Sequence, residues 1–482
     1  MTGWRYYAVC LAIWFFNWSV CFTQALRVLE TSTLGPDPQT VNRLNGESFQ
    51  QDALVTFEGH QYAVFWVDDA LNSSVRHLSM SRRHLTSEHS PSFNNWQTFT
   101  FMDYNQTEDD GHDIISLGIA PSDGTVHISF DHHDNQLKYR VSTVGAALHP
   151  MNTTWSADLF GEILDHLPGL EGLNETTYFG SVTYPRFLSG PIQSKNVAKF
   201  LFEIRTGRSG LGDDWLYEYV AGAGWLSIGD YLEGVNNNAY INGLDFDSKE
   251  NLIATWTYRD YVNDTGQDVA VQAGPNGPEN NHDMDFSSSP DVGRTWVNNW
   301  GQTIARIAEN SPIVPASAGI TIFSIPKYGG ILNQEAQIVD DAGRVHVLNR
   351  ENTTGVEQWY HYWRSTTAHW TRTPLPLDLP SINNITNTPT VIGKRGKLAT
   401  IPSSNTLLAL LPSNAPYSSA FSVLASTPAG HFHDWSVVWE VGSGCEAEIL
   451  FDRYRLAQGD GVLSLFMVNG TQVQVVDLDP EM

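Results

Sequence analysis

The sequence predicts an all-β fold, a seven-bladed β-propeller, and three observations lead to this prediction. No long amphipathic helical pattern occurs in the 482 residues. Short runs rich in Val, Ile, Phe, Tyr and Trp recur instead, and Gly, Asn, Asp and Pro separate them. Seven of these runs look alike and follow one another at about 50 to 90 residues, as expected for a repeated four-stranded unit.

Each run has the residue types of a buried strand, and most follow a turn of the Asp/Ser-x-Gly kind, such as Ser122-Asp123-Gly124. In a propeller every blade buries both faces against its neighbours, so we expect the aromatic residues, 12% of the chain, to pack between blades. The seven runs, in chain order, are Gln61–Val67, Thr125–Phe130, Lys199–Ile204, Asn251–Trp256, Arg344–Leu348, Lys397–Ile401 and Val462–Met467.

The competing architecture is a two-sheet sandwich followed by a second β domain. No low-complexity linker divides the chain, and the proline-rich stretch Pro374–Pro380 is too short to act as one. We therefore expect residues 26–482 to form a single propeller domain.

An Asp-box hairpin is predicted at Ser289–Trp296, which fits the pattern S-x-D-x-G-x-T-W. The side chain of Asp291 can accept hydrogen bonds from turn amides, Gly293 permits a positive φ, and Trp296 can pack back onto the strand. Such turns are common in propellers and occur elsewhere too. This motif supports the fold and does not identify a reaction.

Residues 1–25 have the features of a secretory signal peptide. Arg5 supplies a positive charge, Tyr6–Phe22 is apolar apart from Asn17 and Ser19, and a small-residue cleavage site ends at Ala25. The alternative is an N-terminal membrane anchor. We expect a secreted, extracellular protein with no membrane contact after cleavage.

The chain is acidic, with 27 Lys and Arg against 53 Asp and Glu and a formal charge of −26. Binding nucleic acid through its phosphates needs a surplus of cations, so we expect no nucleic-acid partner. Cys445 is the one cysteine beyond the signal segment, which leaves no internal disulfide and no ordinary Cys/His zinc site. The metal content is unknown from the sequence. No cofactor is required, and the Asn/Asp loops leave structural calcium as an option.

The residues best suited to chemistry lie between positions 111 and 208. His112 opens one strand, His132 and His133 follow the next, and Tyr184 and Arg205 come after them. A turn between the strands can bring His112 close to one of the other two histidines. Imidazole carries protons near neutral pH, a phenol can act as acid or base, and a guanidinium binds a carboxylate. β-Elimination from a uronic acid needs these groups, whereas glycoside hydrolysis usually needs paired carboxylates.

Each of these residues also has a structural interpretation. His112 could bond a neighbouring turn, Tyr184 could be a packed strand-end aromatic, and Arg205 could pair with an acid. Successive side chains point to opposite faces of a strand, so at most one of His132 and His133 is expected to face a site.

At these positions the chain resembles secreted propeller proteins of the BNR-repeat class, which includes ulvan lyases and fungal L-rhamnose-α-1,4-D-glucuronate lyases. The resemblance covers most of the chain beyond the signal segment, and the first two matching stretches are the most specific. The stretches are residues 111–133, 182–187, 202–210, 241–248, 281–296 and 333–350.

The resemblance implies a seven-bladed propeller and a lyase with its site at one mouth of the central channel. His112 and Tyr184 would be the acid and base in an order left open, Arg205 would neutralise the uronate carboxylate, and His132 or His133 would assist. The implied partner is an acidic polysaccharide or oligosaccharide, and we expect a monomer. Weaker candidates for substrate contacts are Arg208, Asn242, Tyr258, Arg259, Asn333, Gln334, His361 and Arg364.

Two departures from the family pattern matter. Some relatives hold a structural zinc with cysteines that this chain lacks, and the stretch 148–174 looks like an insertion that could reshape the cleft. For a secreted protein of this class we expect rhamnosyl-glucuronate caps of plant arabinogalactan, or ulvan-like glycans, as the substrate. The alternatives are a carbohydrate-binding propeller without catalysis and a sialidase-like exo-glycosidase.

Overall fold

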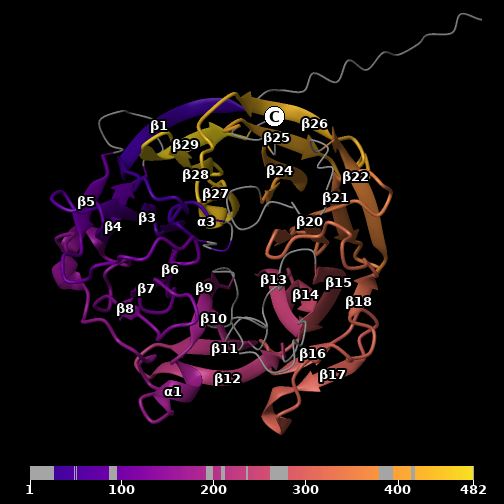
Figure 1. The fold of residues 1–482 in the computed structure, drawn as a ribbon, viewed down its shortest axis with the longest axis horizontal. Helices are drawn as coiled ribbons and strands as arrows, with labels where there is room; N and C mark the ends of the chain where they lie inside the picture. Colours follow the sequence, from indigo (N-terminus) through magenta and orange to yellow (C-terminus); the bar gives the residue numbers. More distant parts are fainter. Residues whose placement is uncertain are drawn as a thin grey trace, which may run out of the picture.

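Seven β-sheets surround a central axis in the computed structural model, and each is one blade of a propeller (Figure 1). The predicted all-β, seven-bladed fold is confirmed. The structure describes residues 26–47, 49, 52–85, 95–190, 199–207, 212–234, 237–260, 280–378, 395–413 and 418–480. The predicted signal peptide, residues 1–25, lies outside these ranges.

The first three complete blades follow the chain order from the inner to the outer strand. They are β2 (Leu54–Phe57), β3 (His60–Asp68), β4 (Arg76–His84) and β5 (Gln97–Thr100); β6 (Ile115–Ile119), β7 (Val126–Phe130) and β8 (Tyr139–Val141); and β9 (Val182–Ser189), β10 (Phe200–Thr206), β11 (Asp213–Val220) and β12 (Gly224–Leu232).

Three further blades continue around the ring. They are β13 (Asn237–Phe246), β14 (Leu252–Asp260), β15 (Asn281–Ser289), β16 (Thr295–Val297) and β17 (Thr303–Arg306), with β18 (Thr321–Phe323) also paired to β15; β19 (Ala336–Val339), β20 (Val345–Glu351), β21 (Gln358–Arg364) and β22 (Trp370–Asp378); and β23 (Lys397–Ile401), β24 (Thr406–Pro412), β25 (Phe421–Ser426) and β26 (Ser436–Val441).

The closing blade joins the two ends of the described chain. β27 (Leu450–Phe451), β28 (Leu463–Asn469) and β29 (Gln472–Asp479) supply its inner strands, and β1 (Arg27–Pro36) pairs antiparallel with β29 as its outer strand. The helical segments are short: η2 (Pro150–Asn152), η3 (Ala157–Leu159), α1 (Glu175–Tyr178), η5 (Ile307–Glu309) and α3 (Arg453–Gln458). Within the described ranges, no helix combines the length and the apolar character that spanning a membrane requires.

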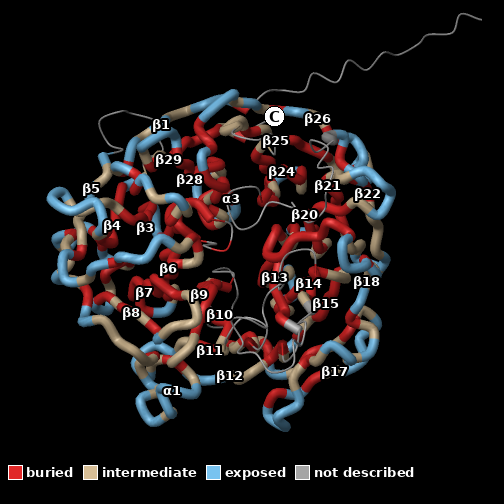
Figure 2. The backbone as a smooth tube through the Cα atoms, viewed as in Figure 1, coloured by how far each residue is buried: buried red, intermediate tan, exposed pale blue. Residues whose placement is uncertain are grey.

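The seven runs predicted from the sequence fall in seven different blades. Six of them are the second strand of their blade, and Lys397–Ile401 is instead the inner strand β23. Inner and second strands are buried on both faces because neighbouring blades pack against them, and Figure 2 shows this buried ring around the axis. This packing explains why the runs read as continuous apolar stretches with little alternation.

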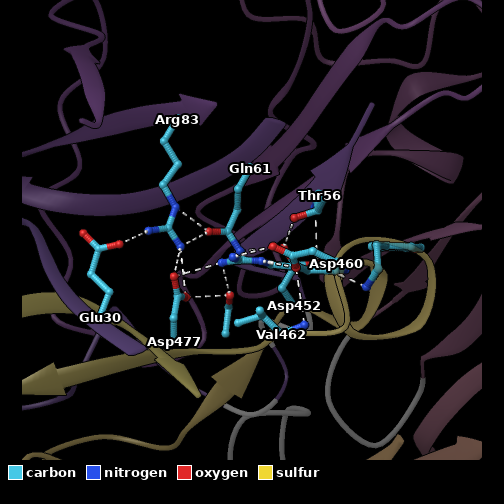
Figure 3. A network of polar contacts seen from close by, with 11 residues as sticks. Glu30, Thr56, Gln61, Arg83, Asp452, Asp460, Val462 and Asp477 are labelled. Atoms are coloured by element: carbon cyan, nitrogen blue, oxygen red, sulfur yellow. Dashed lines mark hydrogen bonds and ion pairs between the residues drawn. The ribbon is translucent and has the colours of Figure 1, made fainter. Parts of the chain in front are cut away.

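A buried polar network ties the closing blade to the first complete blade (Figure 3). Arg83 on β4 donates to Asp477 on β29 at 2.7 Å and to Gln61 on β3 at 2.9 Å. Gln61 donates in turn to Asp452, the residue that caps α3. Arg455 on α3 also pairs with Asp477, at 2.9 Å. The ring is therefore closed by charges as well as by strand pairing.

The Asp box forms the hairpin between β15 and β16. Asp291 accepts from the backbone N–H of Thr295 at 2.7 Å, Gly293 has φ +84°, and the indole of buried Trp296 donates to the Gly293 carbonyl at 3.0 Å. Both hydrogen bonds and the positive φ of Gly293 lie within the turn and hold its shape, so the motif has a structural role.

The insertion-like stretch 148–174 runs along the outer edge of the three-stranded blade. Phe160 bridges Ser142, and Leu164 bridges Tyr139 on the outermost strand β8. Trp155 and Phe160 join the core between this blade and its neighbour. These contacts anchor the stretch on the outer strand of the blade, and an effect of the stretch on the cleft stays a prediction.

Candidate active site

Side chains from six blades meet at one end of the propeller. Antiparallel pairing places the start of each inner strand beside the end of the second strand. His112 precedes β6, Tyr184 lies near the start of β9, and Arg205 lies near the end of β10. We call the side chains gathered at this end the mouth cluster. Its members are Phe49, Asp110, His112, His133, Asp134, Tyr184, Arg205, Tyr240, Arg259, Asn333 and Arg395.

Two imidazoles stack on each other in the mouth cluster, and one carboxylate contacts both of them. The rings of His112 and His133 have centroids 3.9 Å apart and planes 20° apart. The Nδ1 atoms of His112 and His133 lie 2.6 Å and 2.5 Å from the two oxygens of Asp110. The backbone N–H of His112 also donates to Asp110, at 2.9 Å. The predicted approach of His112 to one of the paired histidines is present, and His133 is that histidine.

Tyr184 occupies a strained position that directs its side chain into the mouth cluster. It lies in a β-bulge, where the pairing of β9 with β10 slips between Arg205 and Glu203, and its φ is +60°. Left-handed backbone is uncommon for a tyrosine, and bulges re-aim side chains. The ring of Tyr184 lies 5.7 Å from that of His112 and 5.4 Å from that of Phe49. Tyr184 is 6% exposed, so its phenol is enclosed by these neighbours.

Arg205 also contacts the ring of Tyr184. Its guanidinium carbon is 4.9 Å from the centroid of the Tyr184 ring. Nη2 donates to Asp134 at 2.7 Å and to the hydroxyl of Thr183 at 3.1 Å. Gly212 backs the side chain, because a Cβ at that position would lie 2.8 Å from Cδ of Arg205. The cation is thus held in a fixed orientation and is 1% exposed.

Two more arginines extend the positive charge around the axis. Arg259 lies over the ring of Tyr240 at 4.5 Å and donates to Asn333 at 2.9 Å. Arg395 donates to the backbone carbonyl of Asn333 at 2.8 Å and pairs with Glu448 at 3.2 Å. A chain that is strongly acidic overall therefore places three guanidinium groups around one pair of tyrosines.

The protonation states of the mouth cluster follow from burial and from Asp110. Burial lowers the pKa of His112, although Asp110 opposes the shift. Burial also acts to lower the pKa of His133, but the hydrogen bond and charge of Asp110 outweigh it and the pKa is raised. Burial and Tyr240 raise the pKa of Tyr184, against the three arginines. The site therefore offers a neutral imidazole, a more basic imidazole and a protonated phenol beside a fixed cation.

Asp110, His112 and His133 also place three potential ligand atoms within 4.8 Å of one another, as do Asp165, His166 and Glu175. In the first group, stacked rings do not converge on one point, and each carboxylate oxygen already lies within hydrogen-bond distance of an imidazole nitrogen. We therefore interpret it as a hydrogen-bonded pair of imidazoles. The second group lies on the periphery beside α1, and structural calcium stays a prediction.

Several predicted site residues lie away from the mouth cluster. His132 is buried within its blade, where its Nε2 lies 3.0 Å from Ser129, and burial lowers its pKa to about 3. Tyr258 is buried in the core between blades, with its ring against Trp256. Tyr258 and Arg259 are successive residues of β14, so their side chains point to opposite faces of the strand, whereas His132 and His133 lie in the loop after β7.

The other predicted substrate contacts are dispersed. Asn242 lines a small cavity further along the channel, and Gln334 is buried beside Asn333 with φ +58°. His361 is stacked on His346 in the third strand of its blade, and Arg364 donates to Asn299 at 2.8 Å. Arg364 pairs with Val345 at the opposite end of the blade from the mouth cluster. Arg208 lies outside the described residues.

Five residues of the mouth cluster were not among the predicted site residues: Phe49, Asp110, Asp134, Tyr240 and Arg395. Asp110 stands two positions before His112, a spacing at which an Asp side chain can bond the following backbone N–H, and this signal could have found it. Tyr240 precedes a stretch that resembles the family, residues 241–248. Nothing in the local sequence indicates that Arg395 belongs to the site, because the residues that it contacts lie in other blades.

Comparisons with known proteins agree with the fold. The polysaccharide lyase Uly1 has a similar structure, with a TM-score of 0.63 and 15% identity over 95% of this chain and 98% of its own. An ulvan lyase of a new polysaccharide lyase family, bound to -[GlcA(1-4)Rha3S]-, gives a TM-score of 0.60 and 15% identity over 92% and 95%. No curated protein sequence matches significantly. The model of the BNR repeat-containing family matches residues 60–376, well over half of the chain. The chain therefore belongs to the BNR repeat-containing family.

Proposed function

We propose that the protein is a polysaccharide lyase that cleaves a 4-linked glucuronate by β-elimination. The observation that carries the proposal is the position of the Tyr184 ring, 5.7 Å from the His112 imidazole and 4.9 Å from the Arg205 guanidinium. These are the base, acid and carboxylate-binding groups that the reaction needs, and they come from neighbouring blades. The similarity to solved lyases supports the fold that holds them.

In the proposed reaction, the substrate carboxylate lies against Arg205, whose charge makes the C5 proton more acidic. A base takes that proton, the C5–H electron pair forms the C4–C5 double bond, and the bond from C4 to O4 breaks. An acid then protonates the departing oxygen. His112 and Tyr184 divide these two proton transfers, and each is suited to one of them by its protonation state.

For the substrate we propose rhamnosyl-glucuronate caps of plant arabinogalactan or ulvan-like glycans. An acidic sugar suits the three arginines of the mouth cluster, although the chain as a whole carries a formal charge of −26. Screening at physiological ionic strength limits long-range repulsion to about 8–10 Å, so the local charges decide binding.

The experiment is a product analysis. Incubation with glucuronate-containing plant and algal glycans should give an unsaturated uronate, seen as ultraviolet absorbance and as a product mass one water below that of hydrolysis. His112→Ala should abolish the absorbance, and a saturated, hydrolytic product would contradict the proposal. We also propose that the protein is secreted, and the N-terminal sequence of protein from the culture medium tests this.

A second candidate function is glycan binding without cleavage. The low exposure of Tyr184 and Arg205, 6% and 1%, favours it, because a reacting sugar must contact both groups. Binding measured by calorimetry without any unsaturated product would support this alternative.

A further inference from the structure

Asp110 holds two imidazoles from opposite ends of one β-hairpin. His112 stands before β6 and His133 after β7, and the pairing of Ile115 with Phe130 brings the two ends together. Oδ1 of Asp110 faces Nδ1 of His112, and Oδ2 faces Nδ1 of His133. One carboxylate therefore uses both of its oxygens on the two stacked rings.

This bridge determines which nitrogen of each ring carries a proton. An ionised carboxylate can only accept hydrogen bonds, so each Nδ1 must be an N–H. A neutral imidazole protonated at Nδ1 has its lone pair on Nε2, which points away from Asp110. A base that takes a substrate proton needs that lone pair.

The surrounding charges favour one extra proton on the pair. Rings 3.9 Å apart repel each other when both are cationic, and Arg205 adds a further positive charge that acts on both. Asp110 opposes this repulsion for both rings, and Asp134 does so for His133. Asp113 interacts with the charges of Asp110 and His133, and Asp131 and Lys138 act in turn on Asp113. His133 is the more exposed ring, with 34% of its side chain accessible against 17% for His112.

We propose that Asp110 is a positioning residue that fixes both imidazoles as Nδ1–H tautomers, so that His112 is the proton acceptor through Nε2 and His133 is the cation beside it. This inference rests on the proposed lyase function and assigns the base that the sequence left open. Tyr184 then protonates the departing O4.

The test compares Asp110→Asn with Asp109→Asn. Asp109 is the adjacent acid, and its carboxylate accepts from the backbone of Val41 and Asn42 at 2.9 and 2.8 Å instead of from an imidazole. An amide can donate as well as accept, so Asp110→Asn allows one ring to adopt the opposite tautomer and lose its Nε2 lone pair. We expect kcat/KM on the glycan to fall at least about 100-fold in Asp110→Asn, the lower range for a lost acid–base group. Asp109→Asn should remain within about twofold.

The pH profile separates positioning from a merely structural role. The Asp110 carboxylate acts to raise the pKa of His112, the proposed base, so its loss should move the acidic limb of the kcat/KM profile to lower pH. Two downfield imidazole N–H proton resonances should be present in the NMR spectrum of the wild-type protein, coupled to Nδ1. Both should persist in Asp109→Asn and at least one should disappear in Asp110→Asn.

An unmoved acidic limb, or wild-type resonances assigned to Nε2, would overturn the inference. Activity that a chelator abolishes and Zn²⁺ or Ca²⁺ restores would overturn it as well, in favour of a metal held by the same three groups. If no glycan yields an unsaturated product, the lyase function fails. The wild-type resonances would still decide whether Asp110 holds both imidazoles.

Discussion

The guanidinium of Arg205 lies over the ring of Tyr184, with its central carbon 4.9 Å from the ring centroid. A cation at this distance stabilises the phenolate, but burial and Tyr240 outweigh it and raise the pKa of Tyr184. The phenol therefore keeps its proton at neutral pH in the unliganded protein. A substrate carboxylate on Arg205 would remove part of that cation's influence, which makes the phenol better suited to donate a proton than to accept one.

Replacing Tyr184 with Phe should abolish turnover while preserving glycan binding. The ring and its packing against Phe49, His112 and Arg205 remain, and only the hydroxyl is lost. We expect kcat to fall about 10²- to 10⁴-fold, the range for a lost acid or base. Calorimetric titration with the glycan should give a Kd close to that of the wild type.

Tyr240→Phe is the matched control for Tyr184→Phe. Its hydroxyl accepts from Asn238 at 3.0 Å and belongs to the same pair of tyrosines. We expect a small change in kcat there. Equal losses in the two variants would contradict a specific role for the Tyr184 hydroxyl.

Arg205→Lys should impair the enzyme most on an ionised substrate. Lysine keeps the positive charge but loses the planar donors that contact Asp134 and Thr183 and can bind a carboxylate with two hydrogen bonds. On the glycan whose glucuronate carboxylate is unesterified, we expect kcat/KM to fall about 100-fold, the effect of losing one aligned hydrogen-bond donor. On the methyl ester of the same glycan the loss should be clearly smaller. A uniform loss on both substrates would instead indicate a structural role.

Most of the strand content could be predicted because it depends on local patterns. A run such as Thr125–Phe130 is apolar, rich in β-branched residues and preceded by a turn, and these features indicate a strand whatever the arrangement of the sheets. Closure of the ring could not be predicted in the same way. The pairing of Arg27 with Asp479 joins residues 452 positions apart, and no local signal records it.

For the candidate site, the sequence indicated which residue types take part but not which residues they contact. His112, His133, Tyr184 and Arg205 stand at strand ends, and antiparallel strands of adjacent blades bring such ends together. Tyr258 and Arg259 are adjacent in the sequence yet face opposite sides of β14, so a pattern match cannot say which one reaches the axis. Asp110 is one of 53 acidic residues, and its contacts alone distinguish it. The catalytic roles stay predictions.

Arg83→Met should destabilise the propeller far more than Arg27→Met, although both arginines pair with acids of β29. The side chain of Arg83 is fully buried and bonds Asp477 and Gln61, whereas that of Arg27 is 71% exposed and bonds Asp479. Leaving a buried charge without its partner costs about 3–5 kcal/mol, and an exposed pair contributes about 0–1 kcal/mol. Urea unfolding followed by tryptophan fluorescence measures both free energies. Similar values for the two variants would show that Arg455 alone compensates for the loss at Asp477.

Asp285→Asn should remove part of the pH dependence of stability. Burial raises the pKa of Asp285 from 3.8 to about 7, so the folded state binds a proton that the unfolded state releases between these values. Its contribution to the free energy of unfolding is fully present below about pH 4 and declines by up to about 1.4 kcal/mol per pH unit until about pH 7. The neutral amide has no proton to lose, so the variant should show a flatter profile of unfolding free energy against pH across this window.

Unfolding in urea at pH 4.5, 5.5, 6.5 and 7.5 measures the difference between Asp285→Asn and the wild type. Asp158→Asn, a change in an exposed residue of η3, provides the comparison and should leave the slope unchanged. A slope in Asp285→Asn equal to that of the wild type would mean that Asp285 is already ionised in the folded protein at pH 4.5.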